Sequence, residues 1–406
     1  MRIGIVGCGP AGLATALLLS RGGHDVALFE RFDEPHAVGS GFILQPTGLA
    51  VLSELGLSDQ IHDWGQRLDR IYGVAEPSGR IVLNVNYAAL GEGFHGLAVH
   101  RAALFDVLYG AVQQSGIEVI TGCDVRAIEY SDAGDPAIDG ADQHHKRFDL
   151  IVDASGARSV LRQYATRPRN ERSLEYGAIW GTFEWPGEPF DMRMLEQRYV
   201  GAHTMIGVLP IGRHRGAERN LVAFFWSLKT AAHPVWLDAG LEVWKSEVRN
   251  IWPESDAILQ QIRDPSQMAL AIYGHSTLSR PYGSRMAFVG DAAHSTSPQL
   301  GQGANMALLD AWALSEALNV PGDIDEQLRR YAQSRRWHVR AFQWSSLAMT
   351  PFYQSDSRVL AALRDLLFDP VSKLPIARRI VAGLISGMLA GPPKGLDYRS
   401  GMRTQD

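Results

Sequence analysis

The sequence predicts an α/β protein in which a domain with a mainly parallel sheet is interrupted by a mixed or antiparallel β-sheet and followed by a helical C-terminal region. Three observations support this fold class. A glycine-rich turn joins a strand to a helix at the start of the chain, a second strand–turn–helix motif follows about 280 residues later, and a tryptophan-rich segment lies between them. The length of 406 residues fits two or three domains at about 150 residues each.

The composition argues against several classes of protein. Hydrophobic residues make up 46% of the chain and charged residues 20%, which is unlike disordered, collagen-like or coiled-coil proteins. A net charge of -5 without a block of Lys or Arg argues against nucleic acid or an anionic membrane as the main partner. Cys8 and Cys123 are too few for a disulfide framework or a CxxC-type zinc site, so we expect no metal and a reducing, cytoplasmic setting.

The first motif occupies the N-terminal 30 residues. Residues 3–6 form a short apolar strand, residues 7–12 read Gly-Cys-Gly-Pro-Ala-Gly, and residues 13–20 follow the apolar pattern of a buried helix. A second strand at residues 25–29 then stops at Glu30. This order of strand, turn, helix, strand and terminal acid is the dinucleotide fingerprint of a Rossmann-type domain.

Each glycine of this turn has a physical role. Gly7 permits the tight turn, Gly9 lets the backbone approach a pyrophosphate, and Gly12 lets the helix pack closely on the strand. The N-terminus of the helix offers N–H groups to the phosphates, and Glu30 is placed to accept hydrogen bonds from a ribose diol. Because FAD and NAD are bound by the same device, these residues leave the identity of the dinucleotide open.

The second motif lies between residues 285 and 310. A buried strand at residues 286–289 ends in Gly290-Asp291-Ala-Ala-His294, and Gly301-Gln-Gly then opens an apolar helix. Small residues at a helix N-terminus suit a flat anionic group. His294 could be a catalytic base, but a lone histidine beside a turn is more often structural, and we favour that interpretation.

Together the motifs resemble the single-component FAD-dependent aromatic hydroxylases, typified by para-hydroxybenzoate hydroxylase and the ubiquinone-pathway hydroxylases. The matching residues are Gly7-x-Gly9-x-x-Gly12, Glu30, Gly290-Asp291-Ala-Ala-His294, Pro298 and Gly301-Gln-Gly-Ala-Asn305. Weaker matches lie between them at Val99-His100-Arg101-x-x-Leu104 and Gly122-x-x-Val125. The resemblance covers roughly residues 1–165 and 280–350 and implies that the cofactor is FAD, with NADPH or NADH as the reductant.

By this resemblance, the adenosine end of FAD would meet the first motif. Glu30 would bind the ribose, Arg31 would lie beside the adenosine, and Val125 would contact the adenine through its backbone. Ala11 and Gly12 would face the pyrophosphate.

The flavin end would meet the second motif. Asp291 would hold the ribityl chain, and Arg101 would lie near the ribityl–pyrophosphate stretch. The loop that contains Gly41 would pass close to the ring, although an ordinary flexible turn is an alternative for this loop. The residues under the pyrimidine edge would be Gly303, Ala304 and Asn305. Reduced flavin carries negative charge at that edge, and a helix N-terminus stabilises such charge by up to about 2 kcal/mol.

A third signature of the family, Gly-Ala-Asp-Gly, departs from the family pattern in this chain. Asp153-Ala-Ser155-Gly156 stands in its place, so Ser155 replaces the aspartate. Serine cannot contribute the charge that orders neighbouring arginines, and Asp153 is no obvious substitute because its direction follows the alternation of a strand. A tolerated substitution is favoured, and nicotinamide reduction is the step that this departure puts in doubt.

The segment from about 172 to 275 differs from the rest of the chain in composition and in its strand-like pattern. It contains six of the ten tryptophans, and strand-like runs at residues 178–183, 204–209 and 221–226 are separated by turns. Such strands could form one wall of an apolar pocket for an aromatic substrate. For any single aromatic residue, a place in the core is the favoured alternative.

These features divide the chain into four parts. They are a FAD-binding domain in two pieces, residues 1–171 and 276–345, an inserted substrate domain, residues 172–275, and a C-terminal helical region, residues 346–406. We expect a solvated helix face to carry Arg329, Arg330, Arg335 and Arg336. The apolar run from Ile380 to Gly391 is too short to span a bilayer. A buried helix is favoured for it, and a membrane-surface helix after Arg378 and Arg379 stays possible.

The resemblance implies a FAD-dependent monooxygenase that uses NAD(P)H and O2 to insert one oxygen atom into an aromatic or polycyclic small molecule through a flavin C4a-hydroperoxide. The cofactor performs this chemistry, so no catalytic side chain is assigned. A halogenase or reductase on the same fold is the nearest alternative, but the Trp-x-Trp-x-Ile-Pro signature of halogenases is missing. Ser155 leaves open a non-redox FAD-binding protein that binds an unstable intermediate. A nicotinamide dehydrogenase is least favoured, and both a monomer and a homodimer are possible.

Overall fold

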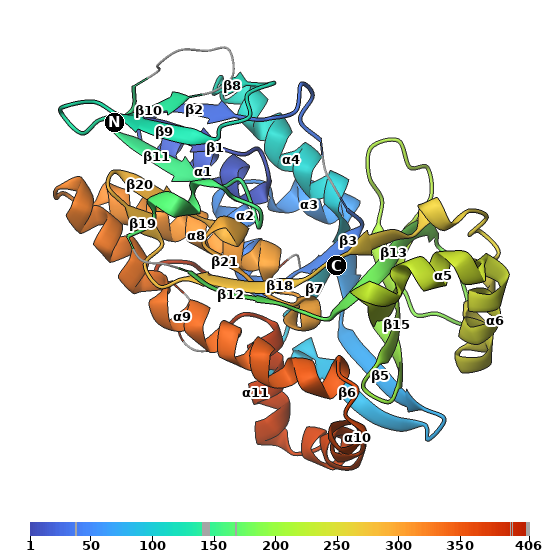
Figure 1. Ribbon diagram of the computed structural model, residues 1–406. Coiled ribbons are helices and arrows are strands. Elements are labelled where there is room, and N and C mark those ends of the chain that lie inside the picture. Colours follow the sequence, from blue (N-terminus) through green and yellow to red (C-terminus); the bar gives the residue numbers. More distant parts are fainter. Residues whose placement is uncertain (37–38, 140–146, 167–168, 390, 392, 403–406) are drawn as a thin grey trace.

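Two large β-sheets dominate the structure, one around the N-terminus and one mainly from the middle of the chain (Figure 1). The structure is a computed structural model that describes residues 1–406 apart from 37–38, 140–146, 167–168, 390, 392 and 403–406. Helices pack against the first sheet, and a group of helices near the C-terminus lies beside the second (Figure 1).

The first sheet has six strands and is parallel apart from one edge strand. In spatial order the strands are β19 (Tyr282–Gly283), β20 (Met286–Phe288), β11 (Leu150–Asp153), β1 (Arg2–Val6), β2 (Asp25–Phe29) and β8 (Glu118–Ile120). Helix α1 (Pro10–Arg21) packs against both α4 (Arg101–Gln114) and α8 (Gly303–Asn319) beside this sheet. The Rossmann-type domain predicted from the glycine motifs is confirmed.

The second sheet has seven strands and is mixed. In spatial order they are β17 (Ala269–Ala271), β13 (Tyr176–Glu184), β16 (Leu221–Lys229), β15 (Thr204–Gly212), β14 (Met194–Val200), β5 (Arg70–Glu76) and β6 (Arg80–Asn86). All neighbours are antiparallel except β14 and β5. Strands β5 and β6 come from the first 171 residues, so this sheet is not built from the middle segment alone. The four-part division of the chain stays a prediction.

Three small sheets complete the strand content of the described residues. Their strands, in spatial order, are β3 (Gly41–Leu44), β7 (Gly96–His100) and β4 (Gln66–Leu68); β12 (Arg169–Ser173), β18 (Gly274–Leu278) and β21 (His294–Ser295); and β10 (Pro136–Asp139) and β9 (Ala127–Tyr130). The β3–β7–β4 sheet contacts β15 with all three of its strands. It therefore joins the mixed sheet to the Rossmann-type domain.

The remaining helices are α2 (Pro46–Glu54), α3 (Ser58–Trp64), α5 (His233–Ala239), α6 (Leu241–Ile251), α7 (Asp256–Leu259), α9 (Ile324–Tyr353), α10 (Arg358–Ser372) and α11 (Pro375–Ile385). The side chain of Asp323 caps α9 by accepting a hydrogen bond from the backbone N–H of Glu326 at 2.7 Å. In Figure 1, α10 and α11 lie at the end of the molecule where β5 and β6 project. No helix within the described part of the chain is long and apolar enough to cross a bilayer.

The expectation of a buried C-terminal helix is only half correct. The inner face of α11 is buried, with Ala382 at 0% and Ile385 at 7% exposed, but Ile380 is 51% exposed. The preceding helix, α10, has only Ala361 and Arg364 buried. This helix pair therefore covers the core with one face and leaves another apolar face in solvent.

The two faces of the mixed sheet contact different surroundings. Alternate residues of β13, β15 and β16 pack with Trp244 and Trp252 in an apolar cluster that includes residues of α6 and α7. The opposite face, which we call the inner face, carries Trp180 and Phe225 and belongs to a cluster that includes residues of α8, α9 and α11. Many of the tryptophans are therefore core residues. The inner face packs against α8, α9 and α11, whereas the other face packs against α6 and α7 of the middle segment.

Candidate FAD-binding and substrate site

The glycine-rich turn after β1 makes backbone contacts that only glycine permits. Gly7 has a φ of +104°, and a Cβ at Gly12 would lie 1.9 Å from the carbonyl oxygen of Gly7. A Cβ at Gly9, by contrast, would meet no atom within 4 Å. Because Gly9 precedes the first turn of α1, this open space lies at the helix N-terminus, where N–H groups lack helical partners. The cradle fits a pyrophosphate.

Glu30 directly follows β2 and lies beside the same turn. Its carboxylate accepts hydrogen bonds from the backbone N–H of Cys8 at 2.8 Å and of Phe32 at 3.2 Å, and the residue is 8% exposed. The exposed Arg31 guanidinium lies 4.5 Å from the centre of the Phe32 ring. Burial and the neighbouring Glu30 raise the pKa of the Cys8 thiol to about 12, so this cysteine stays protonated and unreactive.

The two glycine motifs meet in the fold. A Cβ at Gly290 would lie 3.0 Å from the Cβ of Ala11 and 3.1 Å from the Cβ of Ala307, and Gly290 has a φ of +60°. The turn at Gly290 therefore packs against the N-terminal part of α1 and against α8. Val125 is buried at 6% exposure in the cluster that also contains Phe29 at the end of β2.

Asp291 is exposed, yet the protein around it perturbs its ionisation. Burial of the carboxyl group within surrounding protein atoms raises its pKa, and the charges of His294, Arg101 and Arg162 oppose that effect. A solvent-accessible group in dense surroundings lies in a recess rather than on an open surface. Arg101, at the start of α4, is thus close enough for its charge to act on Asp291.

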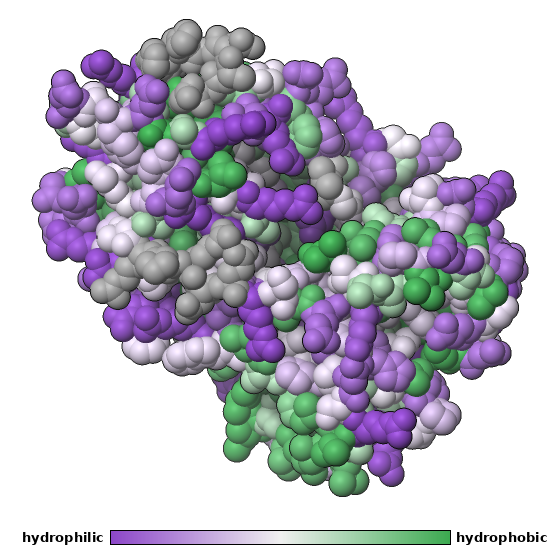
Figure 2. All heavy atoms as spheres, viewed as in Figure 1, coloured by the Kyte–Doolittle hydropathy of each residue, from purple (hydrophilic) through white to green (hydrophobic). Residues whose placement is uncertain are grey.

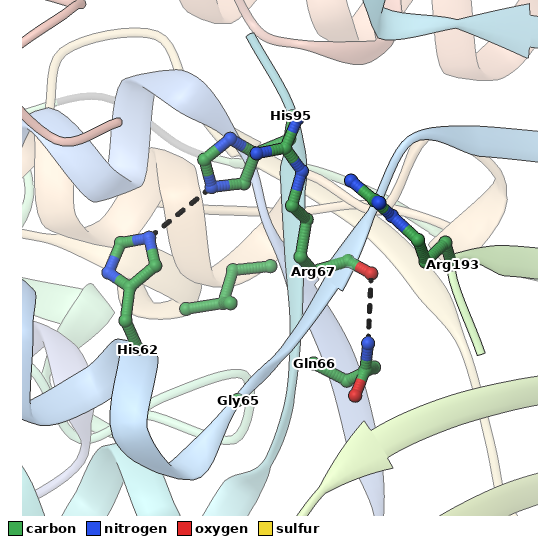
Figure 3. Close-up of a pocket in the computed structure, with 7 residues that line it drawn as sticks. His62, Gly65, Gln66, Arg67, His95 and Arg193 are labelled. Carbon is green, nitrogen blue, oxygen red and sulfur yellow. Dashed lines mark hydrogen bonds between the residues drawn. The ribbon is translucent and has the colours of Figure 1, made fainter. Parts of the chain in front are cut away.

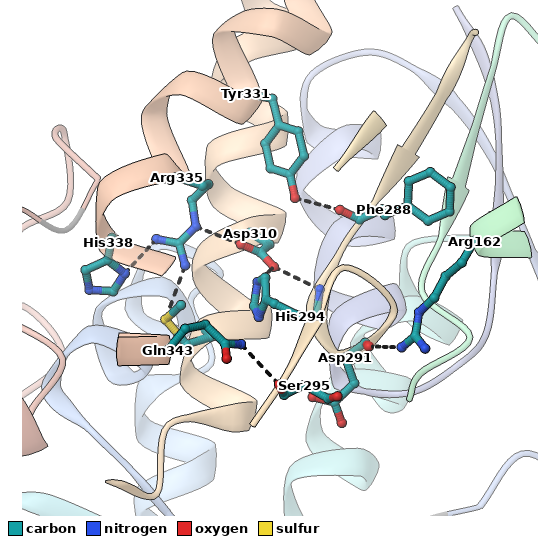
Figure 4. A network of polar contacts seen from close by, with 12 residues as sticks. Arg162, Phe288, Asp291, His294, Ser295, Asp310, Tyr331, Arg335, His338 and Gln343 are labelled. Atoms are coloured by element: carbon teal, nitrogen blue, oxygen red, sulfur yellow. Dashed lines mark hydrogen bonds and ion pairs between the residues drawn. The ribbon is translucent and has the colours of Figure 1, made fainter. Parts of the chain in front are cut away.

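Behind this recess lies a buried ionic network (Figure 4). Asp310 of α8 accepts hydrogen bonds from the Gly290 backbone N–H at 2.9 Å, from His294 Nε2 at 2.6 Å and from Arg335 Nε at 2.7 Å. Burial alone would raise the pKa of Asp310, but His294 and Arg335 outweigh it, and the pKa is lowered. Arg335 also contacts His338 Nδ1 at 3.0 Å, and burial followed by the Arg335 charge lowers the pKa of His338 to about 3.

This network corrects one expectation and supports another. The sequence pattern placed Arg335 on a solvated face, but the residue is 1% exposed and pairs with Asp310. Helical spacing alone could not show this, because Asp310 is 25 residues away in the chain. His294 is 7% exposed and held by Asp310, which supports its structural interpretation over that of a catalytic base.

The Asp153–Ser155 segment also differs from the expectation. The fully buried Asp153 carboxylate accepts hydrogen bonds from the Ser155 hydroxyl at 2.6 Å and from the Ser159 hydroxyl at 2.5 Å. Burial raises the pKa of Asp153, while these hydroxyls and the Arg162 charge oppose the shift. Arg162 in turn donates to the carbonyl oxygen of Asp291 at 2.5 Å (Figure 4). Asp153 therefore places a carboxyl group beside this arginine, contrary to the expectation that it is no substitute for the family aspartate.

The N-terminus of α8 is open on one side. A Cβ at Gly303 would meet no atom within 4 Å, and the neighbouring Ala304 is half-buried. The side chain of Asn305 is fully buried, accepts a hydrogen bond from the Gln45 N–H at 2.7 Å and donates to the Ile43 carbonyl oxygen at 3.0 Å. These bonds fix α8 against the end of β3, so Asn305 could meet a cofactor only through its backbone.

Two buried amide atoms beside this helix start have no hydrogen-bond partner among the described residues. They are Nε2 of Gln45 and Oε1 of Gln302. Nε2 of Gln45 lies 4.0 Å from the position of a Cβ on Gly301, the left-handed residue of the loop. Oε1 of Gln302 faces the turn after α11, because it lies 3.1 Å from the position of a Cβ on Gly387.

The loop before β3 joins this region to the mixed sheet. The hydroxyls of Ser40 and Thr182 lie 2.8 Å apart, and a Cβ at Gly41 would lie 2.3 Å from Cγ2 of Ile211. Arg101 donates its backbone N–H to the carbonyl oxygen of Ser40 at 2.9 Å. The loop predicted to pass near the flavin ring therefore also contacts the inner face of the mixed sheet.

Aromatic side chains line that inner face next to the loop. The rings of Trp180 and Phe225 stack with centroids 4.3 Å apart, and the indole N–H of Trp180 donates to the Tyr273 hydroxyl at 2.8 Å. The Phe225 ring lies over Gly207, where a Cβ would be 1.9 Å from it. The absence of a side chain at Gly207 thus leaves room for the Phe225 ring to lie flat on the sheet, with the Trp180 ring stacked beside it.

A small cavity of about 140 Å³ lies elsewhere and contains none of the predicted site residues (Figure 3). It is lined by His62, Gly65, Gln66, Arg67, His95, Leu97 and Arg193. His62 and His95 face each other with Nε2 atoms 3.3 Å apart, and Asp69 pairs with both Arg67 and Arg193. The polar groups of this cavity are largely matched to one another. Among the described residues, no group of three or more His, Cys, Asp or Glu is arranged to hold a metal ion.

Comparison with known proteins assigns the family. Residues 1–344 match the model of the FAD binding domain family. The chain belongs to this family. It is 29% identical over 341 residues to 3-amino-4-hydroxybenzoate 2-monooxygenase of Streptomyces cremeus, covering 82% of this chain and 83% of the relative. It is 26% identical to salicylate hydroxylase of Pseudomonas putida, covering 90% of this chain and 88% of the relative. The protein is an FAD-dependent monooxygenase, and the predicted family and cofactor are confirmed.

Solved structures confirm the fold. The crystal structure of Klebsiella pneumoniae HpxO complexed with FAD and uric acid matches this monooxygenase with a TM-score of 0.80, 22% identity and 97% coverage of each chain. The structure of the tetrameric form of 2-methyl-3-hydroxypyridine-5-carboxylic acid oxygenase matches with a TM-score of 0.73 and 21% identity, covering 97% of this chain and 99% of that chain.

The structure of this monooxygenase brings most of the sequence-predicted residues into one region. Gly7, Gly9, Ala11, Gly12 and Glu30 surround the turn after β1, and Gly290 packs against Ala11. The residues that sequence reasoning missed are Asp310, Arg335 and Gln45, whose partners are distant in the chain. Pairing between residues that are far apart in the chain leaves no local pattern, so a single sequence could not have identified these contacts.

Proposed function

We propose that this monooxygenase uses NADPH or NADH and O2 to hydroxylate an aromatic small molecule bound against the inner face of the mixed sheet. The observation that carries this proposal is the contact between the Ser40–Gly41 loop and the inner face. That contact brings the aromatic pair of Trp180 and Phe225 to the same region as the proposed flavin site. Stacked rings favour a flat aromatic ligand. The relatives named after hydroxybenzoates and salicylate support this substrate class.

We propose that the adenosine end of FAD lies along β1, α1 and β2. The cradle at Gly7, Gly9 and Gly12 would bind the pyrophosphate with the N–H groups of Ala11 and its neighbours. The Glu30 carboxylate would bind the ribose, with Arg31 and Val125 beside the adenosine. Glu30 already accepts a hydrogen bond from Cys8 N–H, which fixes the carboxylate toward this turn.

The flavin end would extend past Asp291 and Arg101 to the N-terminus of α8. Asp291 would hold the ribityl hydroxyls, and the Gly41 loop would lie along the ring. Residues 303–305 would meet the pyrimidine edge through their backbone N–H groups. Open space at Gly303 leaves room for the ring, and the Asn305 side chain is already bonded to Gln45, so only its backbone is available. When bound, FAD supplies the redox chemistry, accepting hydride from a reduced nicotinamide and activating O2.

The side chains of the protein would bind the substrate, orient it toward the flavin site and shield it from water. The inner face would hold the aromatic ring at a fixed height over the flavin site, and the stacked pair would exclude water from it. Burial raises the pKa of the Tyr273 hydroxyl to about 12, so Tyr273 stays protonated at neutral pH while it accepts from Trp180. We also propose a cytoplasmic location, which the low cysteine content of the chain, two in 406 residues, supports. Monomer and homodimer remain equally compatible with the proposal.

The test is a set of turnover measurements with salicylate, 3-hydroxybenzoate and urate as probes. We expect at least one probe to stimulate NAD(P)H oxidation and O2 uptake and to yield a product heavier by one oxygen atom. Substrate-free oxidation alone, or flavin reduction without a hydroxylated product, would contradict the proposal.

A matched pair of variants tests the role of the inner face. Phe225→Leu removes a ring from the inner face, whereas Phe224→Leu removes the adjacent ring from the outer cluster. We expect Phe225→Leu to raise KM at least tenfold and to uncouple NADPH oxidation from product formation. Phe224→Leu should lower thermal stability with KM unchanged. Equal effects on KM would show that the inner face is not the substrate wall.

A further inference from the structure

Helix α10 is packed with its charge inward. Arg364 is 0% exposed, and its guanidinium lies 5.1 Å from the ring of Tyr199 and 5.4 Å from the ring of Tyr353. It bonds to Asp365 Oδ1 at 2.7 Å and to the Phe352 carbonyl oxygen at 3.0 Å. An amphipathic helix normally buries its apolar stripe, so a buried arginine here frees the apolar stripe for something outside the core.

That apolar stripe faces solvent. Its residues recur at helical spacing along α10 and continue into α11: Val359 (75% exposed), Leu363 (41%), Leu366 (59%), Leu367 (43%), Val371 (46%), Leu374 (57%), Ile376 (77%) and Ile380 (51%). Among the described residues, nine of the twenty exposed large hydrophobic side chains lie between positions 359 and 389. Figure 2 shows the resulting apolar patch at the end of the molecule occupied by α10 and α11 in Figure 1. Such a concentration marks an interaction surface.

The charge of this helix pair is opposite to that of the protein. Residues 358–385 contain five basic and two acidic side chains, whereas the whole chain has a net charge of -5. Arg358, Arg378 and Arg379 are exposed, and the ion pairs given by the described residues leave these three without an acidic partner. Net charge over the whole chain therefore hides a local basic region.

We propose that the α10–α11 helix pair is a peripheral membrane-binding surface for anionic lipid. The leucine-rich stripe would enter the headgroup region, and Arg358, Arg378 and Arg379 would bind lipid phosphates. A second copy of this chain is a poorer occupant, because a twofold contact would place two basic patches against each other. The inner face of α11 packs in the same apolar cluster as the inner face of the mixed sheet, so this helix lies between the proposed lipid surface and that cluster.

The experiment is sedimentation of the full-length, FAD-loaded protein with phosphatidylglycerol vesicles and, separately, with phosphatidylcholine vesicles. We expect binding to phosphatidylglycerol at low salt and at least tenfold weaker binding to phosphatidylcholine. Arg378→Gln with Arg379→Gln should weaken binding by about fivefold for each arginine removed. Added salt should weaken binding in the same direction.

The apolar contribution is tested with matched double variants. Leu366→Gln with Leu367→Gln should reduce vesicle binding at least tenfold. The control, Val235→Gln with Val243→Gln, alters apolar residues on α5 and α6 that are more exposed, at 67% and 63%, than the 59% and 43% of the test pair, and it should leave binding unchanged. Because all four positions are exposed, the variants should keep the FAD content and melting temperature of the parent.

Three results would overturn the proposal. They are no vesicle binding by the parent protein, equal binding to both lipids, and equal losses in the test and control variants. Analytical ultracentrifugation tests the other occupant, a second copy of the chain. If the protein is a dimer and the double variant Leu366→Gln with Leu367→Gln dissociates it, the stripe is a dimer interface instead.

Discussion

The cofactor side and the substrate side of this monooxygenase encode their sites in different ways. On the cofactor side, the backbone forms the site, and the spacing of the glycines determines where the chain can turn and pack closely. A Cβ at Gly12, for example, would lie 1.9 Å from the carbonyl oxygen of Gly7. On the substrate side, the site is a wall of side chains, and which face of a strand carries them decides it. Trp180 faces inward, whereas Trp226 on the neighbouring strand packs in the outer cluster.

This difference shows which kind of site can be predicted from a single sequence. Glycines that permit close approach are a rare residue type at fixed spacing, so they are visible in one sequence. Aromatic residues in strands serve core and pocket alike, so their number says little until the sheet is folded. The same contrast holds within the cofactor side, where Asp310 and Arg335 support the visible motif but were not themselves visible.

The largest effect is expected from breaking the ionic network behind the second motif. Asp310→Asn leaves the buried guanidinium of Arg335 without its carboxylate, which should cost about 3–5 kcal/mol of unfolding free energy. The control is Glu326→Gln, which removes an exposed pair with Arg330 on the same helix as Arg335 and should cost less than about 1 kcal/mol. Chemical denaturation measures both. Similar losses would show that the buried network contributes nothing special to the cofactor side.

A smaller effect is expected from the glycines, where two substitutions separate folding from binding. Gly12→Ala should destabilise the protein by about 1–3 kcal/mol, because the methyl group overlaps backbone. Gly9→Ala meets open space, so the apoprotein should keep its stability while FAD affinity falls at least tenfold. Thermal melts and flavin fluorescence titrations of the apoproteins check both. Unchanged FAD affinity in Gly9→Ala would place the pyrophosphate elsewhere.

The smallest effect is a dependence of stability on pH. Burial lowers the pKa of His95 and of His100 to about 4, and burial with the Arg335 charge lowers that of His338 to about 3. Each histidine is neutral in the folded state, so its contribution to stability is complete above the unfolded pKa of about 6.5 and is lost as pH falls below it toward those values. Melting temperatures should therefore decline from about pH 6.5 downward. His338→Gln should show a shallower decline, and a parallel curve would contradict the assignment.

The sequence predicted the Rossmann-type domain, the cofactor and the strands of the inserted sheet, because periodicity and glycine spacing are local. It did not predict that β5 and β6 join the mixed sheet, since strand pairing across more than 100 residues leaves no local pattern. It also misjudged Arg335, Asp153 and the apolar run that begins at Ile380, which is 51% exposed. The partner of Arg335 lies 25 residues away, and the exposure of Ile380 depends on how α11 packs on the core, so neither leaves a local pattern. Asp153 bonds to the nearby Ser155 and Ser159, and the folded turn brings their hydroxyls to its carboxyl group.

The most direct test of the central claim is an anaerobic visible spectrum of the purified, FAD-loaded protein during titration with NADPH and then NADH, with and without an aromatic probe. The account predicts that the flavin band is bleached by at least one nicotinamide. It also predicts that the band returns when O2 is admitted. A flavin that stays oxidised under all these conditions would contradict a self-sufficient monooxygenase and indicate an outside electron donor or a binding role.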